Sequence, residues 1–196
     1  MGYRLRALTL ALALGVTAVG ASAPAASADS LFGQQPPAST GGVGVGTGPS
    51  ILPGRPGPEV AGTRAVVVRG VAYAPSRAPL AVKMTIWAAN KIRHKPYKWG
   101  GGHARWNDSG YDCSGSVSYA LHGGGLIDYT LASTGFMRWG DRGAGRWISV
   151  YASKTHTFMI VAGLRFDTSG AGESGPRWRL EPRWERNFKV RHPTGL

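Results

Sequence analysis

Apolar residues begin to recur at helical spacing near residue 80 of this chain. The stripe includes Leu80, Met84, Trp87, Ala88 and Ile92. Pro79 suits the first turn of a helix, and Pro96 sets a limit before which the helix should end. A second helix is expected over residues 111–121, with Val117, Ala120 and Leu121 on its apolar face and with glycines 123–125 ending it.

The pattern changes to strands after residue 145. Large apolar residues alternate with small or polar ones over 147–151, and two further apolar runs cover 156–161 and 164–167, separated by Gly163. Short turns between such runs predict neighbouring antiparallel strands. Residues 65–68 and 71–73 suggest a short strand or an extended arm. Helices followed by strands indicate an α+β fold.

The first 62 residues divide into two segments that we expect to lie outside the folded domain. Residues 1–28 have a basic start, an apolar stretch over 7–19 and a small-residue site at 26–28, which is typical of a secretory signal peptide. The apolar stretch is short for a membrane anchor, and no later run is long enough for a span. Residues 29–62 are rich in Pro and Gly and predict a disordered linker. Residues 63–196 then form one domain with a basic C-terminal extension.

Composition limits the chemistry that this domain can use. The chain of 196 residues is 42% hydrophobic and 17% charged, which allows a buried core. Cys113 is the only cysteine, so an intramolecular disulfide and a cysteine-cluster metal site are both excluded. In an exported protein, a lone thiol is either buried and inert or retained for its reactivity.

Cys113 lies where a reactive thiol would be expected, at the start of the second predicted helix. The unpaired amides of a first helical turn favour a thiolate and can stabilise an oxyanion. A nucleophilic cysteine also needs a base. Of the five histidines, we favour His156, because it opens a strand and therefore has a fixed position. Asp167 on the next strand is the candidate for orienting the imidazole, with Thr168 and His192 as alternatives.

Two motifs give the chain a resemblance to the NlpC-type cysteine peptidases of bacterial cell walls. They are Pro96-Tyr97-Lys98-Trp99-Gly100-Gly101 and Asp112-Cys113-Ser114-Gly115, followed by His156. The resemblance covers roughly residues 80–170. It implies a papain-like fold, in which the nucleophile begins a helix packed on an antiparallel sheet. It further implies that Cys113 is the nucleophile and His156 the base, and it places Tyr97, Trp99, Asp112 and Ser114 in the substrate groove. Neither a metal nor an organic cofactor is expected.

The chain departs from the family pattern at three places. The third catalytic position is commonly His, Asn or Gln in the family, whereas Asp167 or Thr168 occupies it here. The stretch between the glycines and Cys113 is lengthened by residues 103–108. The chain after residue 170 has no obvious family counterpart. We expect the last two features to change the shape of the groove.

The strong positive charge of the chain suggests anionic partners outside the cell. The formal net charge is +13, and removing Arg4 and Arg6 from the 23 basic residues leaves 21 against 10 acids, a balance of +11. Peptidoglycan stem peptides and anionic wall polymers fit this charge. Basic and aromatic residues within 177–191 would also suit nucleic acid, but the export signal argues against that partner.

Together these observations predict a secreted cysteine hydrolase, an endopeptidase acting on peptidoglycan stem peptides. Two alternatives remain. One is a catalytically silent wall-binding protein that keeps the groove. The other is an amidase or acyltransferase that uses the same Cys-His pair.

Overall fold

The computed structural model describes residues 57–170, 175–180, 183 and 185–196. The expected signal peptide and residues 29–56 of the expected linker lie outside the described residues. The remaining residues of that linker, 57–62, are part of the domain. Here β1 (Glu59–Val60) pairs in parallel with β3 (Val71–Pro75), and the indole of Trp87 donates a hydrogen bond to the Pro58 carbonyl at 3.3 Å. The linker boundary at residue 62 was therefore placed too late.

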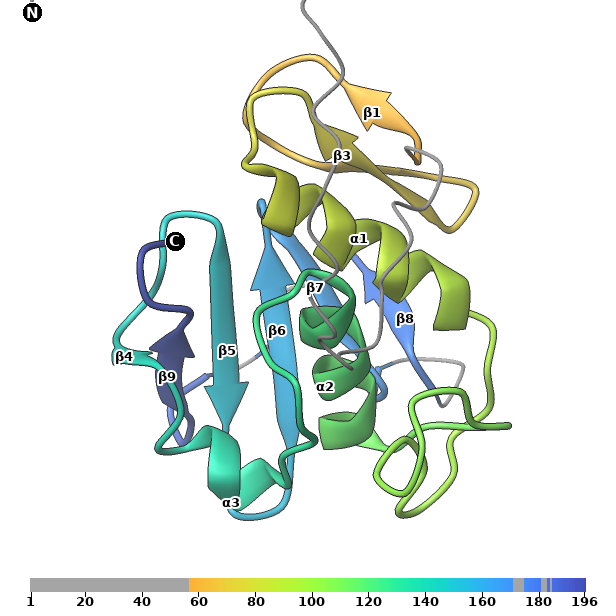
Figure 1. The fold of residues 1–196 in the computed structure, drawn as a ribbon, viewed down its shortest axis with the longest axis vertical. Coiled ribbons are helices and arrows are strands. Elements are labelled where there is room, and N and C mark those ends of the chain that lie inside the picture. The colour runs from red at the N-terminus through yellow and green to blue at the C-terminus, as the bar shows by residue number, and fades with distance from the viewer. Residues whose placement is uncertain (1–56, 171–174, 181–182, 184) are drawn as a thin grey trace, which may run out of the picture. The chain divides into compact units, whose positions relative to one another are not determined.

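Three short strands form a small sheet beside the first helix. The strand β2 (Val66–Val68) pairs with β3 as an antiparallel hairpin, and the order in the sheet is β1-β3-β2. Asn90 of the helix holds the middle strand, because its side chain accepts from the amide of Ala72 and donates to the carbonyl of the same residue. Residues 65–73, for which the sequence predicts a short strand or an extended arm, thus form a hairpin that is bonded to the helix (Figure 1).

Both expected helices are present, and a short third one follows them. They are α1 (Leu80–Ile92), α2 (Cys113–Gly123) and α3 (Ser133–Phe136). The helices α1 and α2 cross closely, because a Cβ atom on Gly123 would overlap the side chain of Ala88. Residues 111 and 112, expected to be helical, precede α2: Tyr111 forms a β-bridge with Tyr97, and Asp112 caps the helix.

A six-stranded antiparallel sheet forms the second layer. Its strands are β4 (Asp141–Arg142), β5 (Ile148–Ala152), β6 (Thr157–Val161), β7 (Leu164–Asp167), β8 (Arg177–Arg179) and β9 (Lys189–His192), in the order β4-β9-β5-β6-β7-β8. The expected strands β5, β6 and β7 and the α+β class are confirmed. The C-terminal residues are not an extension of the domain, since β8 and β9 belong to the sheet and β9 lies between β4 and β5.

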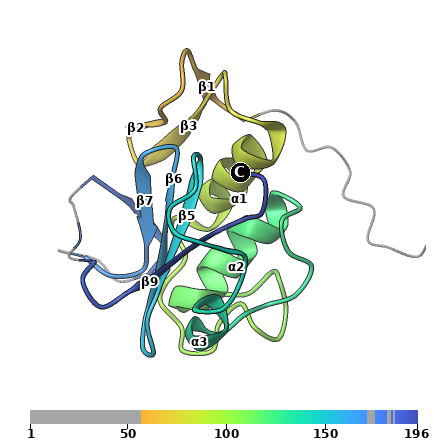
Figure 2. The same cartoon turned by 90° about the vertical axis from the view of Figure 1, so that its left-hand side faces the viewer.

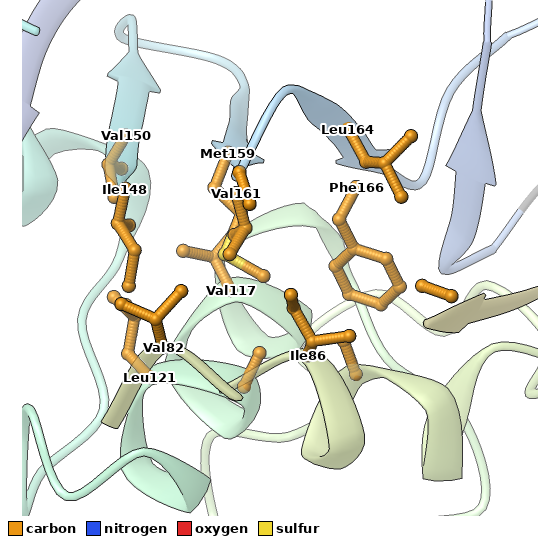
Figure 3. Packing of buried hydrophobic residues seen from close by; sticks show 14 of the residues in the cluster. Val82, Ile86, Val117, Leu121, Ile148, Val150, Met159, Val161, Leu164 and Phe166 are labelled. Atoms are coloured by element: carbon orange, nitrogen blue, oxygen red, sulfur yellow. The ribbon is translucent and has the colours of Figure 1, made fainter. Parts of the chain in front are cut away.

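The core lies between the helices and one face of this sheet (Figures 2 and 3). Fully or almost fully buried side chains come from both layers: Val82, Ile86, Val117, Leu121, Ile148, Val150, Met159, Val161, Leu164 and Phe166. Each such side chain contributes about 1.5–3 kcal/mol when it leaves water. This packing fixes α2 against β6 and β7. Within the described residues, none of the helices has the length and apolar character needed to cross a bilayer.

Candidate active site

Cys113 is the first residue of α2, and Asp112 fixes that start. The Asp112 carboxylate accepts a hydrogen bond from the amide of Gly115 at 2.7 Å, which is the bond expected of an N-cap residue. Cys113 is 8% exposed and lines a groove of about 530 Å³. Its thiol is therefore mostly covered but faces a groove, in contrast to a thiol sealed in the apolar core.

His156 lies directly before β6 and not within it, and its chain neighbour Thr155 lines the groove. The turn from β5 positions it: the amide of Ser153 donates to the carbonyl of His156 at 2.8 Å, and the amide of His156 donates to the Ser153 hydroxyl at 3.1 Å. The starts of α2 and β6 lie at the same end of the molecule, near α3 (Figures 1 and 2). The layered packing thus brings together two residues that are far apart in the sequence.

The imidazole of His156 lies between a carboxylate and the thiol. Its Nε2 donates to Asp167 Oδ1 at 2.8 Å, and a hydrogen bond also joins the ring to Cys113. Because Nε2 faces Asp167, Nδ1 is the ring nitrogen left for the thiol. The hydroxyl of Ser133 lies 3.6 Å from the Cys113 sulfur, and the backbone amide of Thr157 also donates toward it.

These contacts change the acidity of both groups in the direction of an ion pair. Burial tends to raise the pKa of Cys113, but the hydrogen bonds from His156, Ser133 and Thr157 and the attraction to His156 outweigh it, so the pKa is lowered. Burial tends to lower the pKa of His156, yet the hydrogen bonds and charges of Asp167 and Cys113 raise it to about 9. The site therefore favours a thiolate beside an imidazolium at neutral pH.

Asp167 is the residue that the structure places on the far side of His156. Its side chain is fully buried, and hydrogen bonds from His156 and from the amide of Ser169, with the charge of Arg183, lower its pKa against the effect of burial. The two alternatives do not take this position. Thr168 is buried beside Asp167, and no hydrogen bond among the described residues joins it to the ring. His192 Nδ1 donates to the Gly143 carbonyl at 3.1 Å, near the β4 edge of the sheet.

Aromatic residues form the open side of the groove. Tyr97 and Trp99 both line it, together with Ser114, and Trp99 is 87% exposed. Burial and the neighbouring Cys113 and Asp112 raise the pKa of Tyr97, which keeps its hydroxyl protonated. An exposed indole beside a thiol has no partner in the core and is available for a ligand.

Asp112 also lines the groove, but its carboxylate is already engaged. Besides the cap on Gly115, Oδ1 accepts from Ser114 at 3.2 Å and lies 3.0 Å from His103 Nε2, and Oδ2 accepts from the amide of Gly100 at 3.1 Å. The structure thus gives Asp112 a structural task, while the prediction that it binds substrate stays untested.

Sequence reasoning missed His103 and Ser133 as groove residues. Both line the groove with Cys113. The hydrogen bond to Asp112 raises the pKa of His103 against the effect of burial. The position of His103 directly after three glycines, in the loop that carries Tyr97, was a usable signal. Ser133 had no such signal, because it is 20 positions from Cys113 in the sequence and only the folded structure brings it to the thiol.

The glycine-rich loop packs against the start of α2. A Cβ atom on Gly115 would overlap the carbonyl of Gly101, so this approach requires glycine. The lengthened stretch after it is held in place as well: Trp106 stacks on His122 with ring centroids 3.9 Å apart, and Lys98 bonds Asp108 at 2.7 Å. The loop therefore forms a fixed wall of the groove. Among the described residues, no group of three or more His, Cys, Asp or Glu side chains could hold a metal ion.

Comparison with known proteins gives similarity only at the level of solved structures. No family model and no curated protein sequence matches the chain. The peptidoglycan hydrolase RipB from Mycobacterium tuberculosis is 24% identical over 60% of this chain and 69% of its own, with a TM-score of 0.45. The P60 domain of an antigen from M. avium subspecies paratuberculosis is 21% identical over 57% and 93%, with a TM-score of 0.44.

A hypothetical invasion protein of M. tuberculosis gives a similar result, with 21% identity and a TM-score of 0.44. The match covers 60% of this chain and 66% of that protein, so slightly less than two thirds of its length is represented.

Proposed function

We propose that the chain is a secreted cysteine endopeptidase that hydrolyses amide bonds in peptidoglycan stem peptides. The observation that carries the proposal is that His156 interacts both with Cys113, which lines an open groove, and with Asp167. A thiolate, a proton donor and an orienting carboxylate in contact are the groups that acyl transfer from an amide requires.

The proposed reaction begins with attack of the Cys113 thiolate on the amide carbonyl. The carbonyl oxygen becomes an oxyanion, for which the amides of Cys113 and Ser114 at the start of α2 are suitable donors, because they have no acceptor within the described part of the chain. The imidazolium of His156 gives its proton to the leaving amine as the C–N bond breaks. Neutral His156 then takes a proton from water, which attacks the thioester and releases the acid and the thiolate.

The proposed roles of the other residues follow from their positions. Asp167 holds the imidazole through Nε2 and stabilises its positive charge. Tyr97, Trp99 and Ser114 line the groove and would contact the stem peptide. A nucleophile that begins a helix packed on an antiparallel sheet supports the expected papain-like architecture.

The substrate class rests on sequence features. The Tyr97–Gly101 and Asp112–Gly115 motifs resemble the wall peptidases, and the N-terminal 28 residues have the pattern of an export signal. Cell-wall peptides are an abundant source of amide bonds outside a bacterial cell, so they are available to an exported hydrolase with this groove. The positive charge would attract the protein to anionic wall polymers, and added salt would weaken this attraction.

Digestion of purified sacculi tests this proposal. We expect the mature wild-type protein to release peptides with a new amino terminus, Cys113→Ala to release none, and His156→Gln to lose most of the activity. His94→Gln is the matched control, because His94 is exposed and outside the groove.

The products separate the proposal from its alternatives. Mass spectrometry that found whole stem peptides freed from glycan would indicate an amidase. Sacculus binding without release, together with a thiol inert to alkylation, would indicate a silent wall-binding protein. Digestion by Cys113→Ala at the wild-type rate would refute the proposal.

A further inference from the structure

Arg183, which lies between β8 and β9 in the sequence, contacts Asp167 beside the imidazole of His156. Arg183 Nη1 donates to Asp167 Oδ2 at 3.1 Å and to the Ser169 hydroxyl at 2.5 Å. Asp167 Oδ1 meanwhile accepts from His156 at 2.8 Å. The two carboxylate oxygens are therefore divided between the imidazole and the guanidinium.

Aromatic rings hold the guanidinium in this position. The Arg183 Cζ atom lies 5.3 Å from the ring centroid of Phe158 and 5.5 Å from that of Phe188, which is within the range of cation–π attraction. The same two rings are neighbours of His156, with centroids 6.4 Å from the imidazole. Arg183 and His156 thus contact the same carboxylate and the same two aromatic rings. A movement of either side chain therefore changes the environment of the other.

Other charged and polar groups also face this cluster. Arg165 Nε lies 3.6 Å from Asp167 Oδ2, and the amide and hydroxyl of Ser169 both donate to Oδ1 at 2.9 and 3.1 Å. The Ser169 hydroxyl lies 3.3 Å from His156 Nε2. Cys113 also interacts with the ring. Because Asp167 is fully buried, its charge is shared among these partners and not with bulk water.

We propose that Arg183 is a positioning residue of the active site, which fixes the Asp167 carboxylate against His156 and limits how strongly that carboxylate holds the imidazolium proton. The inference rests on the proposed roles of Cys113 and His156. With Arg165 as its only other cationic neighbour among the described residues, the Asp167 carboxylate would hold more strongly the proton that His156 must give to the leaving amine. The guanidinium counters part of that negative charge, so proton transfer becomes easier. The C-terminal segment would in this way complete the active site.

The geometry gives the direction in which removal of Arg183 should act. Without the guanidinium, the field of Asp167 at His156 becomes more negative, and the imidazolium is stabilised. A unit charge roughly 6 Å away changes a pKa by about 2 units at an effective dielectric constant of about 20, and solvent screening of the 27% exposed Arg183 side chain reduces this to about 1 unit. The proton should therefore leave His156 at a pH about 1 unit higher in a variant that lacks the cation.

Alkylation of Cys113 by iodoacetate measures this without any substrate. The rate rises as the thiolate forms, and it falls when His156 loses its proton, because the anionic reagent is attracted by the imidazolium. In Arg183→Gln, we expect the alkylation rate to fall at a pH about 1 unit higher than in wild type. In Arg183→Lys, we expect it to fall close to the wild-type pH. Arg142→Gln is the matched control, since Arg142 is an exposed cation on the distant edge strand β4.

Each outcome of this experiment decides the inference. If the alkylation rate of Arg183→Gln falls at the same pH as that of wild type, the inference is overturned. A rate that is lower at every pH but falls at the wild-type pH also overturns it, because a purely structural role of Arg183 would give that result. An equal shift in Arg142→Gln would assign the effect to net charge and would also overturn it. If wild-type Cys113 itself alkylates like an ordinary thiol, the proposed Cys-His pair fails, and this result is distinguishable from failure at Arg183.

Discussion

Replacing Asp167 with asparagine should narrow the pH range in which the protein is active. Asparagine keeps the shape of the side chain, and its amide oxygen can still accept the Nε2 proton of His156, but the negative charge is lost. In the proposed mechanism, the active form has a Cys113 thiolate beside a His156 imidazolium. Its lower pH limit is the lowered pKa of Cys113, and its upper limit is the pKa of His156 at about 9.

The size of the effect follows from the forces on His156. Its pKa is raised from 6.5 to about 9, and Asp167 contributes the first of the raising hydrogen bonds as well as a charge attraction. At about 1.4 kcal/mol per unit, that shift corresponds to roughly 3 kcal/mol in favour of the imidazolium. Loss of the charge should remove about half of it, and Arg183, left without its anion, acts in the same direction. We therefore expect the upper limit to fall by about 1–2 pH units.

The assay is the pH dependence of kcat/KM on a soluble stem peptide, compared with the falling limb of iodoacetate alkylation. Asp128→Asn serves as the control, because Asp128 is exposed and outside the groove. In Asp167→Asn, the upper pH limit of kcat/KM and the falling limb of alkylation should both move to lower pH. In the control Asp128→Asn, neither should move. An upper limit that stayed near pH 9 in this variant would refute the reasoning, since it would show that the charge of Asp167 does not control the imidazole.

Two further predictions concern the walls of the groove. Asp112→Ala should lower the free energy of unfolding by about 1–3 kcal/mol, measured by urea denaturation, because the α2 cap and the bonds to Gly100 and His103 are lost; a change below 0.5 kcal/mol would contradict the capping role. Trp99→Ala should leave the unfolding free energy within about 0.5 kcal/mol of wild type, since the side chain is 87% exposed, but should raise KM several-fold. An unchanged KM would exclude Trp99 from substrate binding.

Local sequence patterns predicted the helix that begins at Cys113 and the strand that directly follows His156. The helical stripe from Leu80, the apolar face of α2 and the alternation in β5, β6 and β7 are properties of short windows, and the structure has these elements within one or two residues. Asp167 could be named because β6 and β7 are joined by a tight turn, which brings it near His156.

The features that the sequence did not predict depend on contacts between segments that are distant in the chain. The strands β8 and β9 are short and rich in Arg and Lys, so no alternation marked them, and their partners β7 and β5 determine them. The ion pair of Arg183 with Asp167 joins two residues that are 16 positions apart, and no short window of the sequence encodes it. The thiol contact of Ser133 is likewise set by the packing of α3 near α2, which no window of the sequence encodes.

The ultraviolet absorbance of the thiolate, followed against pH, tests the central claim most directly. Cys113 is the only cysteine, so the difference between wild type and Cys113→Ala isolates its signal. The account predicts a thiolate already present at neutral pH in wild type and absent there in His156→Gln. A wild-type thiol that ionises only near its ordinary pKa of about 8.5, as the His156→Gln thiol would, contradicts the account.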